Sequence, residues 1–167
     1  MAKFEVAKEL PESIDEVNIK LPVRATELSA GYDFVSPINT VVKAHGRSLV
    51  PTGVTCKLKP FEYLQVVPRS GLALKKGITV LNTPGTVDAD YYPNCIGVIL
   101  YNTTDEDFEI KAGDRIAQGI IQTYGRTEDD QSIGKRDGGF GSTGVEAEYG
   151  SYIDYSYNLW YNNMGNT

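Results

Sequence analysis

Apolar and polar residues alternate through much of the chain, which is the pattern of half-buried β-strands. In VTCKLK, residues 54–59, Val54, Cys56 and Leu58 fall on one face of an extended chain, and Thr55 falls on the other face with two lysines. Residues 61–67 and 95–102 also predict strands, and the second segment is apolar enough to be buried on both faces. Residues 108–124 predict a strand, a turn at 112–114 and a further strand.

Helical patterning is weak by comparison, since no window of a dozen residues carries the apolar stripe of an amphipathic helix. Seventeen glycines, eight prolines and eleven tyrosines add turn formers and strand formers. Short strands with turn signals about every ten residues indicate an all-β fold of the barrel or jelly-roll type. The 167 residues, 41% of them hydrophobic, are enough for one domain with a core.

The net charge of −6 excludes a broad cationic surface, so we expect no direct binding to nucleic acid. An anionic ligand remains compatible with this charge if a few cations converge. The N-terminal sequence MAKFEVAKEL lacks the apolar run of a signal peptide, and no segment approaches the roughly 20 apolar residues of a membrane helix. Two cysteines and one histidine give neither a disulfide framework nor a soft zinc site, so we expect an intracellular, cytoplasmic protein with thiols at Cys56 and Cys95.

Two carboxylates stand two residues apart in GTVDADYYP, residues 85–93. Asp88 and Asp90 point the same way if the chain is extended there. One of them could bind a metal or activate a water molecule while the other makes a structural contact. A solvated turn explains the same residues.

The segment PRSGLALKKG, residues 68–77, directly follows a predicted strand. Arg69, Ser70 and the amide of Gly71 offer a cation, a hydroxyl and a backbone donor, which together can hold phosphate oxygens. The segment lacks the GK[ST] ending of a P-loop. An ordinary strand-to-loop junction is the alternative interpretation.

Two further segments, AGYDF (30–34) and AGDRIAQ (112–118), have the composition of turns. Taken singly, their polar residues Asp33, Asp114, Arg115 and Gln118 fit surface positions that make local ion pairs.

Near the C-terminal end, RDGGFGSTG (136–144) surrounds Phe140 with four glycines. A packed core would lock such a ring between bulky neighbours, so this segment predicts an arm that moves and closes on a ligand. A flexible linker is the alternative.

The five segments AGYDF, PRSGLALKKG, NTPGTVDADYY, AGDRIAQ and RDGGFGSTG occur in this order, and together they resemble the five motifs of the trimeric dUTPases. The resemblance covers roughly residues 20–144. It implies a distorted jelly-roll β-barrel of the dUTPase type that forms a homotrimer with three shared active sites. It also implies Mg²⁺-dependent hydrolysis of dUTP to dUMP and pyrophosphate, which keeps uracil out of DNA and supplies dUMP for thymidylate synthesis.

By this resemblance, Asp88 is the carboxylate that activates water for in-line attack on the α-phosphorus. An aspartate is ionised at neutral pH and can orient a water molecule, but it is a weak base. Most of the rate enhancement must then come from charge stabilisation around the phosphates. The resemblance also places Tyr91 beneath the deoxyribose. In a straight strand Tyr91 would face away from Asp88, so this assignment requires a bend near Asp90.

The resemblance assigns the phosphate contacts to two segments. Arg69, Ser70 and Gly71 match the group near the scissile bond, and Gln118 matches the residue that reaches the α-phosphate. Asp33 matches a carboxylate near the water shell of Mg²⁺, with the ion held mainly by substrate phosphates, an environment of hard oxygen ligands that suits this ion.

The remaining substrate contacts are assigned to the third and fifth motifs. Asn82 and the backbone through Thr86 and Val87 match the hairpin that reads uracil. In the arm, Phe140 stacks on uracil, Arg136 clamps the γ-phosphate, Ser142 and Thr143 add hydroxyl donors there, and Gly141 lets the backbone approach closely.

We therefore expect a catalytic jelly-roll domain at residues 1–126, a linker at 127–135, the arm at 136–144 and an acidic, tyrosine-rich extension at 145–167. Phe34 and the pair Pro93-Asn94 depart from the common family pattern, and the extension continues beyond the end of most members. Its five tyrosines and Trp160 could bind a protein partner or cover another subunit, while a poorly ordered terminus explains them equally.

Two other functions compete with this one. The dCTP deaminases share the fold but use a glutamate for proton transfer, and this chain has no glutamate between Glu62 and Glu106 and carries an arm that those enzymes lack. A binding or regulatory module with the dUTPase fold is the second alternative.

Overall fold

The structure is a computed structural model that describes residues 1–134 and Arg136. The chain divides into two units, Met1–Lys135 and Arg136–Thr167, and the fold below is that of the first unit. Its strands are β1 (Lys3–Val6), β2 (Val23–Arg24), β3 (Tyr32–Val35), β4 (Thr40–Val42), β5 (Arg47–Pro51), β6 (Val54–Lys57), β7 (Glu62–Val67), β8 (Ile78–Val80), β9 (Gly85–Asp88), β10 (Gly97–Asn102), β11 (Phe108–Ile110) and β12 (Arg115–Thr123). The helices are α1 (Ser70–Lys76) and two short 3₁₀ helices, η1 (Glu16–Asn18) and η2 (Ala89–Tyr91).

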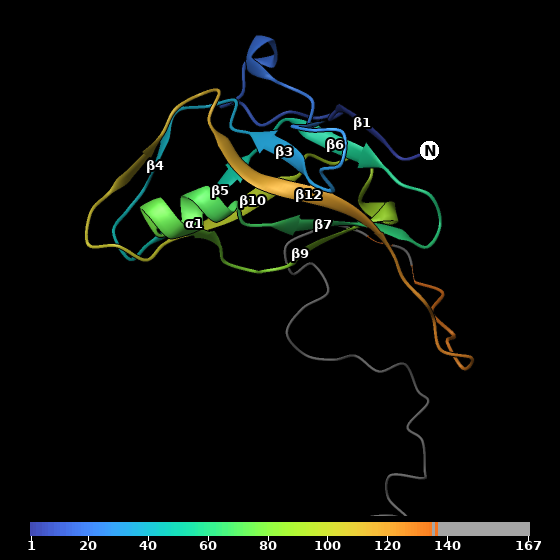
Figure 1. Ribbon diagram of the computed structural model, residues 1–167. Coiled ribbons are helices and arrows are strands. Elements are labelled where there is room, and N and C mark those ends of the chain that lie inside the picture. The colour runs from blue at the N-terminus through green and yellow to red at the C-terminus, as the bar shows by residue number, and fades with distance from the viewer. Residues whose placement is uncertain (135, 137–167) are drawn as a thin grey trace, which may run out of the picture. The chain divides into compact units, whose positions relative to one another are not determined.

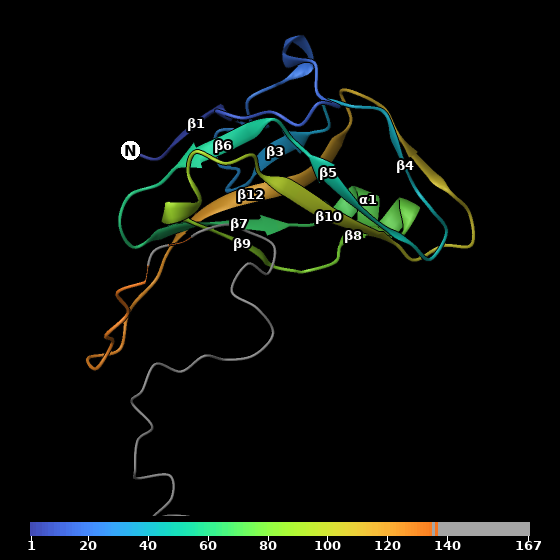
Figure 2. The same ribbon diagram turned by 180° about the vertical axis from the view of Figure 1, so that it is seen from behind.

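The strands are arranged in antiparallel sheets, which confirms the all-β prediction and the strands predicted at 54–59, 61–67, 95–102 and 108–124. The largest sheet has five strands in the order β2-β3-β12-β7-β9, and a three-stranded sheet has the order β5-β10-β8. Two further pairs are β1-β6 and β11-β4. The five-stranded sheet lies toward the viewer in Figure 1, whereas β5, β10 and β8 lie in front in the reverse view of Figure 2. The core lies between these layers, as a two-layer β fold requires.

Phe34 on β3 is the largest fully buried side chain of this core. Its ring meets the ring of Phe4 edge-on at a centroid distance of 5.7 Å. Gly119 on β12 makes room for it, because a Cβ atom at this glycine would lie 2.5 Å from Cε2 of Phe34 and 2.9 Å from Cδ1 of Leu64. The bulky ring at position 34 is thus accommodated by the missing side chain at position 119.

We expect Gly119→Ala to lower the free energy of unfolding by about 1–3 kcal/mol, because the added methyl group overpacks a rigid part of the core. Chemical denaturation measures the change. Gly125→Ala is the matched control, since a Cβ atom there meets nothing within 4 Å. The double variant Gly119→Ala/Phe34→Leu should recover part of the loss, and an additive double variant would contradict this packing.

The strand β10 is buried on one face only. Val98, Leu100 and Asn102 point into the core, but Ile99 on the other face is only half-buried. Its cross-strand neighbours Leu49 and Leu81 are 52% and 46% exposed. The expectation of burial on both faces is therefore wrong for a single chain, because Ile99 and its two leucine neighbours stay partly exposed in the described part of the chain.

The helix α1 was not expected from the sequence, since its seven residues are too few for a clear apolar stripe. Gly77 ends it in the left-handed conformation, with φ of 63°, and its amide donates to the carbonyls of Ala73 and Leu72. Lys75 and Lys76 occupy the last turn, where cations are favoured. The glycine after two lysines is the signal in the sequence that could have predicted this helix end. Among residues 1–134 and 136, no helix has the length and apolar content needed to cross a membrane.

The strand β6 is more buried than its alternation predicts. Thr55, expected on the polar face, is 1% exposed, and its hydroxyl has no hydrogen-bond partner in the described part of the chain. Cys56 is buried beside it, and both cysteines are free thiols, as expected. Burial, with a smaller contribution from the charge of Glu62, raises the pKa of the Cys56 thiol from 9.0 to about 11.

This shift makes stability depend on pH at the alkaline end. Because the folded pKa lies above the unfolded value, the contribution of the thiol is complete below pH 9 and is lost as the pH rises to about 11. We expect the free energy of unfolding of the native chain to fall more steeply over this range than that of Cys56→Ala. Denaturant titrations at pH 8, 9, 10 and 11 measure both slopes, and parallel slopes would contradict the burial of this thiol.

Candidate active site

Three polar side chains, two from β12 and one from the segment that follows β7, converge on the carboxylate of Asp33 on β3. Arg69 donates from Nε to Oδ1 of Asp33 at 3.1 Å, and Gln118 donates from Nε2 to the same oxygen at 3.4 Å. Arg115 donates from Nη1 to Oδ2 at 3.0 Å. Asp33 is only 5% exposed. The two guanidinium groups and the carboxylate together carry one net positive charge, which suits an anionic ligand.

The strand register brings these residues together. Asp33 on β3 lies opposite Gln118 on β12, and Gln118 lies opposite Val67, the last residue of β7. The chain continues from Val67 through Pro68 to Arg69, so the end of β7 delivers this guanidinium to the same place. A bulge in β12 between Arg115 and Ala117 interrupts the pairing with β3 beside Arg115.

These positions correct one expectation. Taken singly, Asp33, Arg115 and Gln118 fitted surface residues with local ion pairs, but Asp33 is buried and its two arginine partners are 36 and 82 residues away. Only the turn residue Asp114 behaves as expected, because its carboxylate is exposed and accepts from the amide of Lys111. Arg115 is the member of the cluster that the sequence did not assign to the site.

A hollow of about 340 Å³ opens beside this cluster, between α1 and the turn from β11 to β12. Arg69, Lys76 and Arg115 line it with cationic groups, and Asp114 is the acidic residue of its lining. Ser70 and Gly71, at the start of α1, are exposed, and a Cβ atom at Gly71 would meet nothing within 4 Å. The cluster therefore borders open space from which a phosphate chain can approach.

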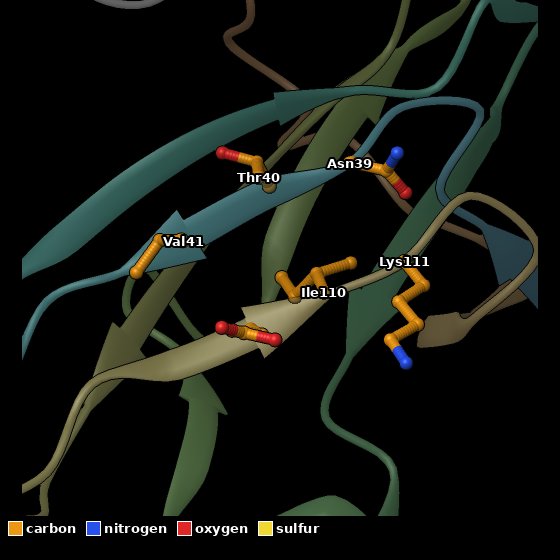
Figure 3. Close-up of a pocket in the computed structure, with 6 residues that line it drawn as sticks. Asn39, Thr40, Val41, Ile110 and Lys111 are labelled. Carbon is orange, nitrogen blue, oxygen red and sulfur yellow. The ribbon is translucent and has the colours of Figure 1, made fainter.

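A second hollow, of about 350 Å³, lies against the β4-β11 pair (Figure 3). Asn39, Thr40 and Val41 line it from one strand, and Ile110 and Lys111 line it from the other. Ile110 lines both hollows. Lys111 is the one cation of this lining, so the second hollow lacks the convergent positive charge of the first.

Asp88 and Tyr91 lie on β9 and the 3₁₀ helix that follows it. The chain leaves the extended conformation after Asp88 and turns through η2, which supplies the bend that the pairing of these two residues required. The hydroxyl of Tyr91 donates to the carbonyl of Cys95 at 2.9 Å. Earlier in the same hairpin, Asn82 packs against Gly85 at the start of β9, and Thr86 and Val87 follow in the strand.

Asp88 lies far from the arginine cluster within one chain. It pairs with Tyr63 near the start of β7, whereas Arg69 follows the other end of this strand. Six residues separate Tyr63 from Arg69, which amounts to about 20 Å along an extended chain. A single chain therefore does not bring Asp88 and Ser70 to one cleft.

Of the residues assigned to the arm, the structure describes Arg136 alone. Arg136 is exposed, and Phe140, Gly141, Ser142 and Thr143 lie outside the described residues, as does the extension at 145–167. Residues 127–134 are exposed and contain neither helix nor strand. The division into linker, arm and extension stays a prediction.

The antiparallel fold and the cationic cluster beside a hollow define a class of all-β proteins with a site suited to an anionic ligand, and comparison with known proteins defines the family. The sequence model of the dUTPase family matches residues 17–144. The deoxyuridine 5'-triphosphate nucleotidohydrolase of Oryza sativa subsp. japonica is 46% identical over 133 residues, which cover 77% of this chain and 76% of the relative. The enzyme of the same name from Rickettsia rickettsii (strain Sheila Smith) is 46% identical over 143 residues, or 80% of this chain and 95% of the relative. The chain belongs to the dUTPase family.

Solved structures agree with this assignment. The crystal structure of dUTPase from Streptococcus mutans superposes with a TM-score of 0.67 at 32% identity, covering 75% of this chain and 98% of that one. A dUTPase from phage phi11 of S. aureus, described with a structural Mg(II) ion, superposes with a TM-score of 0.65 at 19% identity, over 80% of this chain and 97% of that one, and shows likeness of fold alone. The predicted jelly-roll fold of the dUTPase type is thereby confirmed.

Proposed function

We propose that this protein is a dUTP diphosphatase that hydrolyses dUTP to dUMP and pyrophosphate. The observation that carries the proposal is the match of the dUTPase family to residues 17–144, and the two arginines that meet at Asp33 support it, because they form a cationic group suited to a polyphosphate. The reaction keeps uracil out of DNA and supplies dUMP for thymidylate synthesis. A nucleoside triphosphate substrate also favours a cytoplasmic location.

Asp88 is the proposed general base. Its carboxylate accepts a proton from a water molecule as the water oxygen attacks the α-phosphorus. The bond from the α-phosphorus to the bridging oxygen then breaks, and pyrophosphate leaves with the bonding electrons. Arg69 and Gln118 stabilise the charge that develops on the phosphate oxygens, with Ser70 and the amide of Gly71 beside them.

The nucleoside is proposed to bind along the hairpin that contains β9. Asn82 and the backbone at Thr86 and Val87 read the edge of uracil, and close packing there excludes a 5-methyl group. Tyr91 lies beneath the deoxyribose and leaves no space for a 2′-hydroxyl. Its hydroxyl is held by the Cys95 carbonyl, which keeps the ring from swinging out of this position.

The arm is proposed to complete the site by closing over the bound nucleotide. Phe140 stacks on uracil and Arg136 binds the γ-phosphate, while Ser142, Thr143 and the backbone at Gly141 contribute further donors. Ordering of this segment accompanies substrate binding.

The active unit is proposed to be a homotrimer. Asp88 pairs with Tyr63, and the length of about 20 Å along β7 from Tyr63 to Arg69 supports a site that is completed by residues from different copies. The apolar row of Leu49, Ile99 and Leu81 on the outer face of β10 is a surface that a neighbouring copy can cover.

Mg²⁺ is proposed to arrive with the substrate and to neutralise its phosphate charge. Among the described residues, no three histidine, cysteine, aspartate or glutamate side chains gather into a metal site. Asp33, the carboxylate expected near the ion, already accepts hydrogen bonds from three side chains. These residues do not fit a metal site built by the protein, so binding of the ion should require the nucleotide.

The test is the release of pyrophosphate from a panel of dUTP, dCTP, dTTP and UTP, with Mg²⁺ and with EDTA. We expect rapid release from dUTP and much slower release from the other three. Ammonia release from dCTP would indicate a deaminase instead. Tight binding of dUTP with no product at all would indicate a binding or regulatory module.

A further inference from the structure

The buried position of Asp33 gives it a role other than a contact with the metal. Its Oδ1 atom accepts from Nε of Arg69 and Nε2 of Gln118, and its Oδ2 atom accepts from Nη1 of Arg115. A carboxylate offers about four lone-pair directions, so three of them are already used by protein donors. At 5% exposure, Asp33 has little access to the water shell of an ion.

Each of the three donors keeps further hydrogens for a ligand. Arg69 uses Nε for Asp33 and directs Nη1 toward the carbonyl of Arg115 at 3.4 Å, which leaves Nη2. Gln118 uses one hydrogen of its amide and keeps the second, and the side chain lies beside Gly31, where an added Cβ atom would come within 3.3 Å of it. The carboxylate thus fixes these side chains without using up their donor capacity.

Charge explains why a carboxylate is needed at this point. Arg69 and Arg115 are two cations that meet on one anion, and without that anion they would repel one another. The Arg69 side chain is only 22% exposed, so water screens this repulsion incompletely. The Arg115 side chain is 51% exposed and lines the hollow beside the cluster together with Arg69.

We propose that Asp33 is a positioning residue that clamps Arg69 and Gln118 toward the substrate phosphates and holds Arg115 beside them as an additional phosphate-facing cation. This inference rests on the proposed function, because it describes how the same site holds a polyphosphate. In this role Asp33 raises the affinity for the nucleotide by positioning its donors. It contributes nothing to the affinity for Mg²⁺.

The experiment is a titration of the full chain with non-hydrolysable α,β-imido-dUTP, in EDTA and over a series of Mg²⁺ concentrations. Asp33→Asn should weaken binding about 10- to 100-fold in EDTA, the equivalent of one lost charged hydrogen bond. The Mg²⁺ concentration that gives half-maximal enhancement of binding should stay unchanged. Unchanged affinity in EDTA with a raised Mg²⁺ requirement would overturn the proposal and make Asp33 a contact of the metal shell.

A double-variant comparison shows whether Asp33 acts through Arg69. If it does, Arg69→Ala should weaken binding in the native background and add little in the Asp33→Asn background, because the two changes remove the same arrangement. Fully additive losses would contradict the clamp. Asp114→Asn removes the same charge from the rim of the hollow without touching Arg69, and it should not weaken binding.

Arg115→Gln tests the third donor to Asp33. This variant still tests the proposal if Asp33→Asn does not fold. It should weaken binding in EDTA with no change in the Mg²⁺ requirement, and a thermal melt checks that the fold is retained. Native affinity in this variant would refute the role of Arg115. If the native chain itself does not bind α,β-imido-dUTP, the proposed function fails rather than the clamp.

Discussion

Asp88→Asn should reduce the turnover of dUTP by about 10²–10⁴-fold, the usual contribution of a positioned general base. An asparagine has nearly the same shape but accepts no proton from the attacking water. The substitution leaves the phosphate-binding residues of the arginine cluster intact, so the affinity for α,β-imido-dUTP should change little. Pyrophosphate release under saturating dUTP, combined with a binding titration, measures the two effects separately.

Asp105→Asn is the matched control for this variant. It makes the same chemical change at an exposed turn, where the carboxylate lies 2.7 Å from Nε2 of His45. Its turnover should equal that of the native chain. If Asp88→Asn retains native turnover, Asp88 is not the base and the assignment from the family motif is wrong.

Mixing two inactive variants should restore activity. Asp88→Asn lacks the base and Arg69→Ala lacks the phosphate clamp, and each homotrimer should be nearly inactive. Asp88 pairs with Tyr63 near the start of β7, and Arg69 follows the end of this strand. In the proposed shared site the two residues of one chain belong to different sites, so co-assembled chains can form sites in which both are native. Each site needs one chain with an intact Arg69 and a neighbour with an intact Asp88, which holds for one of the three sites in a mixed trimer, so purified mixed trimers should give about a third of native activity.

Co-expression of the two variants with different affinity tags, followed by two-step purification, provides the mixed oligomers. The purified parents, mixed without exchange of subunits, are the control and should give only the sum of their residual activities. Mixed oligomers that do no better than this sum would show that one chain supplies both residues. Recovered activity would also show that the active unit is an oligomer, since a protein that is active as a monomer gives no recovery.

The strands in residues 54–67 and 95–124 were predictable from the sequence. Apolar and polar residues alternate there, and this alternation reflects the extended backbone of each strand by itself. The bend after Asp88 followed from the family resemblance, because it assigned Asp88 and Tyr91 to one nucleotide, and these two side chains would point to opposite faces of a straight strand. The helix α1 was missed, since seven residues between a strand and a glycine leave too short a pattern. The partly exposed face of β10 was also missed, because an apolar residue gives the same sequence pattern on an exposed sheet face as in a core.

The contacts within the site were harder to predict from the sequence than the strands. The motifs gave the identities of Arg69, Gln118 and Asp33, but their contacts depend on the pairing of β3, β12 and β7 across separations of 36 to 85 residues. Arg115 follows Asp114 in the sequence, so a local ion pair was the simpler expectation. In the structure Arg115 instead pairs with Asp33, 82 residues away. No local pattern encodes such a pairing, because it is set by which strands meet and in which register.

The most direct test of a site shared between chains is a crystal structure of the full chain with α,β-imido-dUTP and Mg²⁺. We expect one nucleotide held by the Arg69 guanidinium of one chain, with the Asp88 carboxylate of a neighbouring chain facing its α-phosphorus. A nucleotide contacted by Arg69 and Asp88 of the same chain, or bound away from the cluster around Asp33, would contradict it.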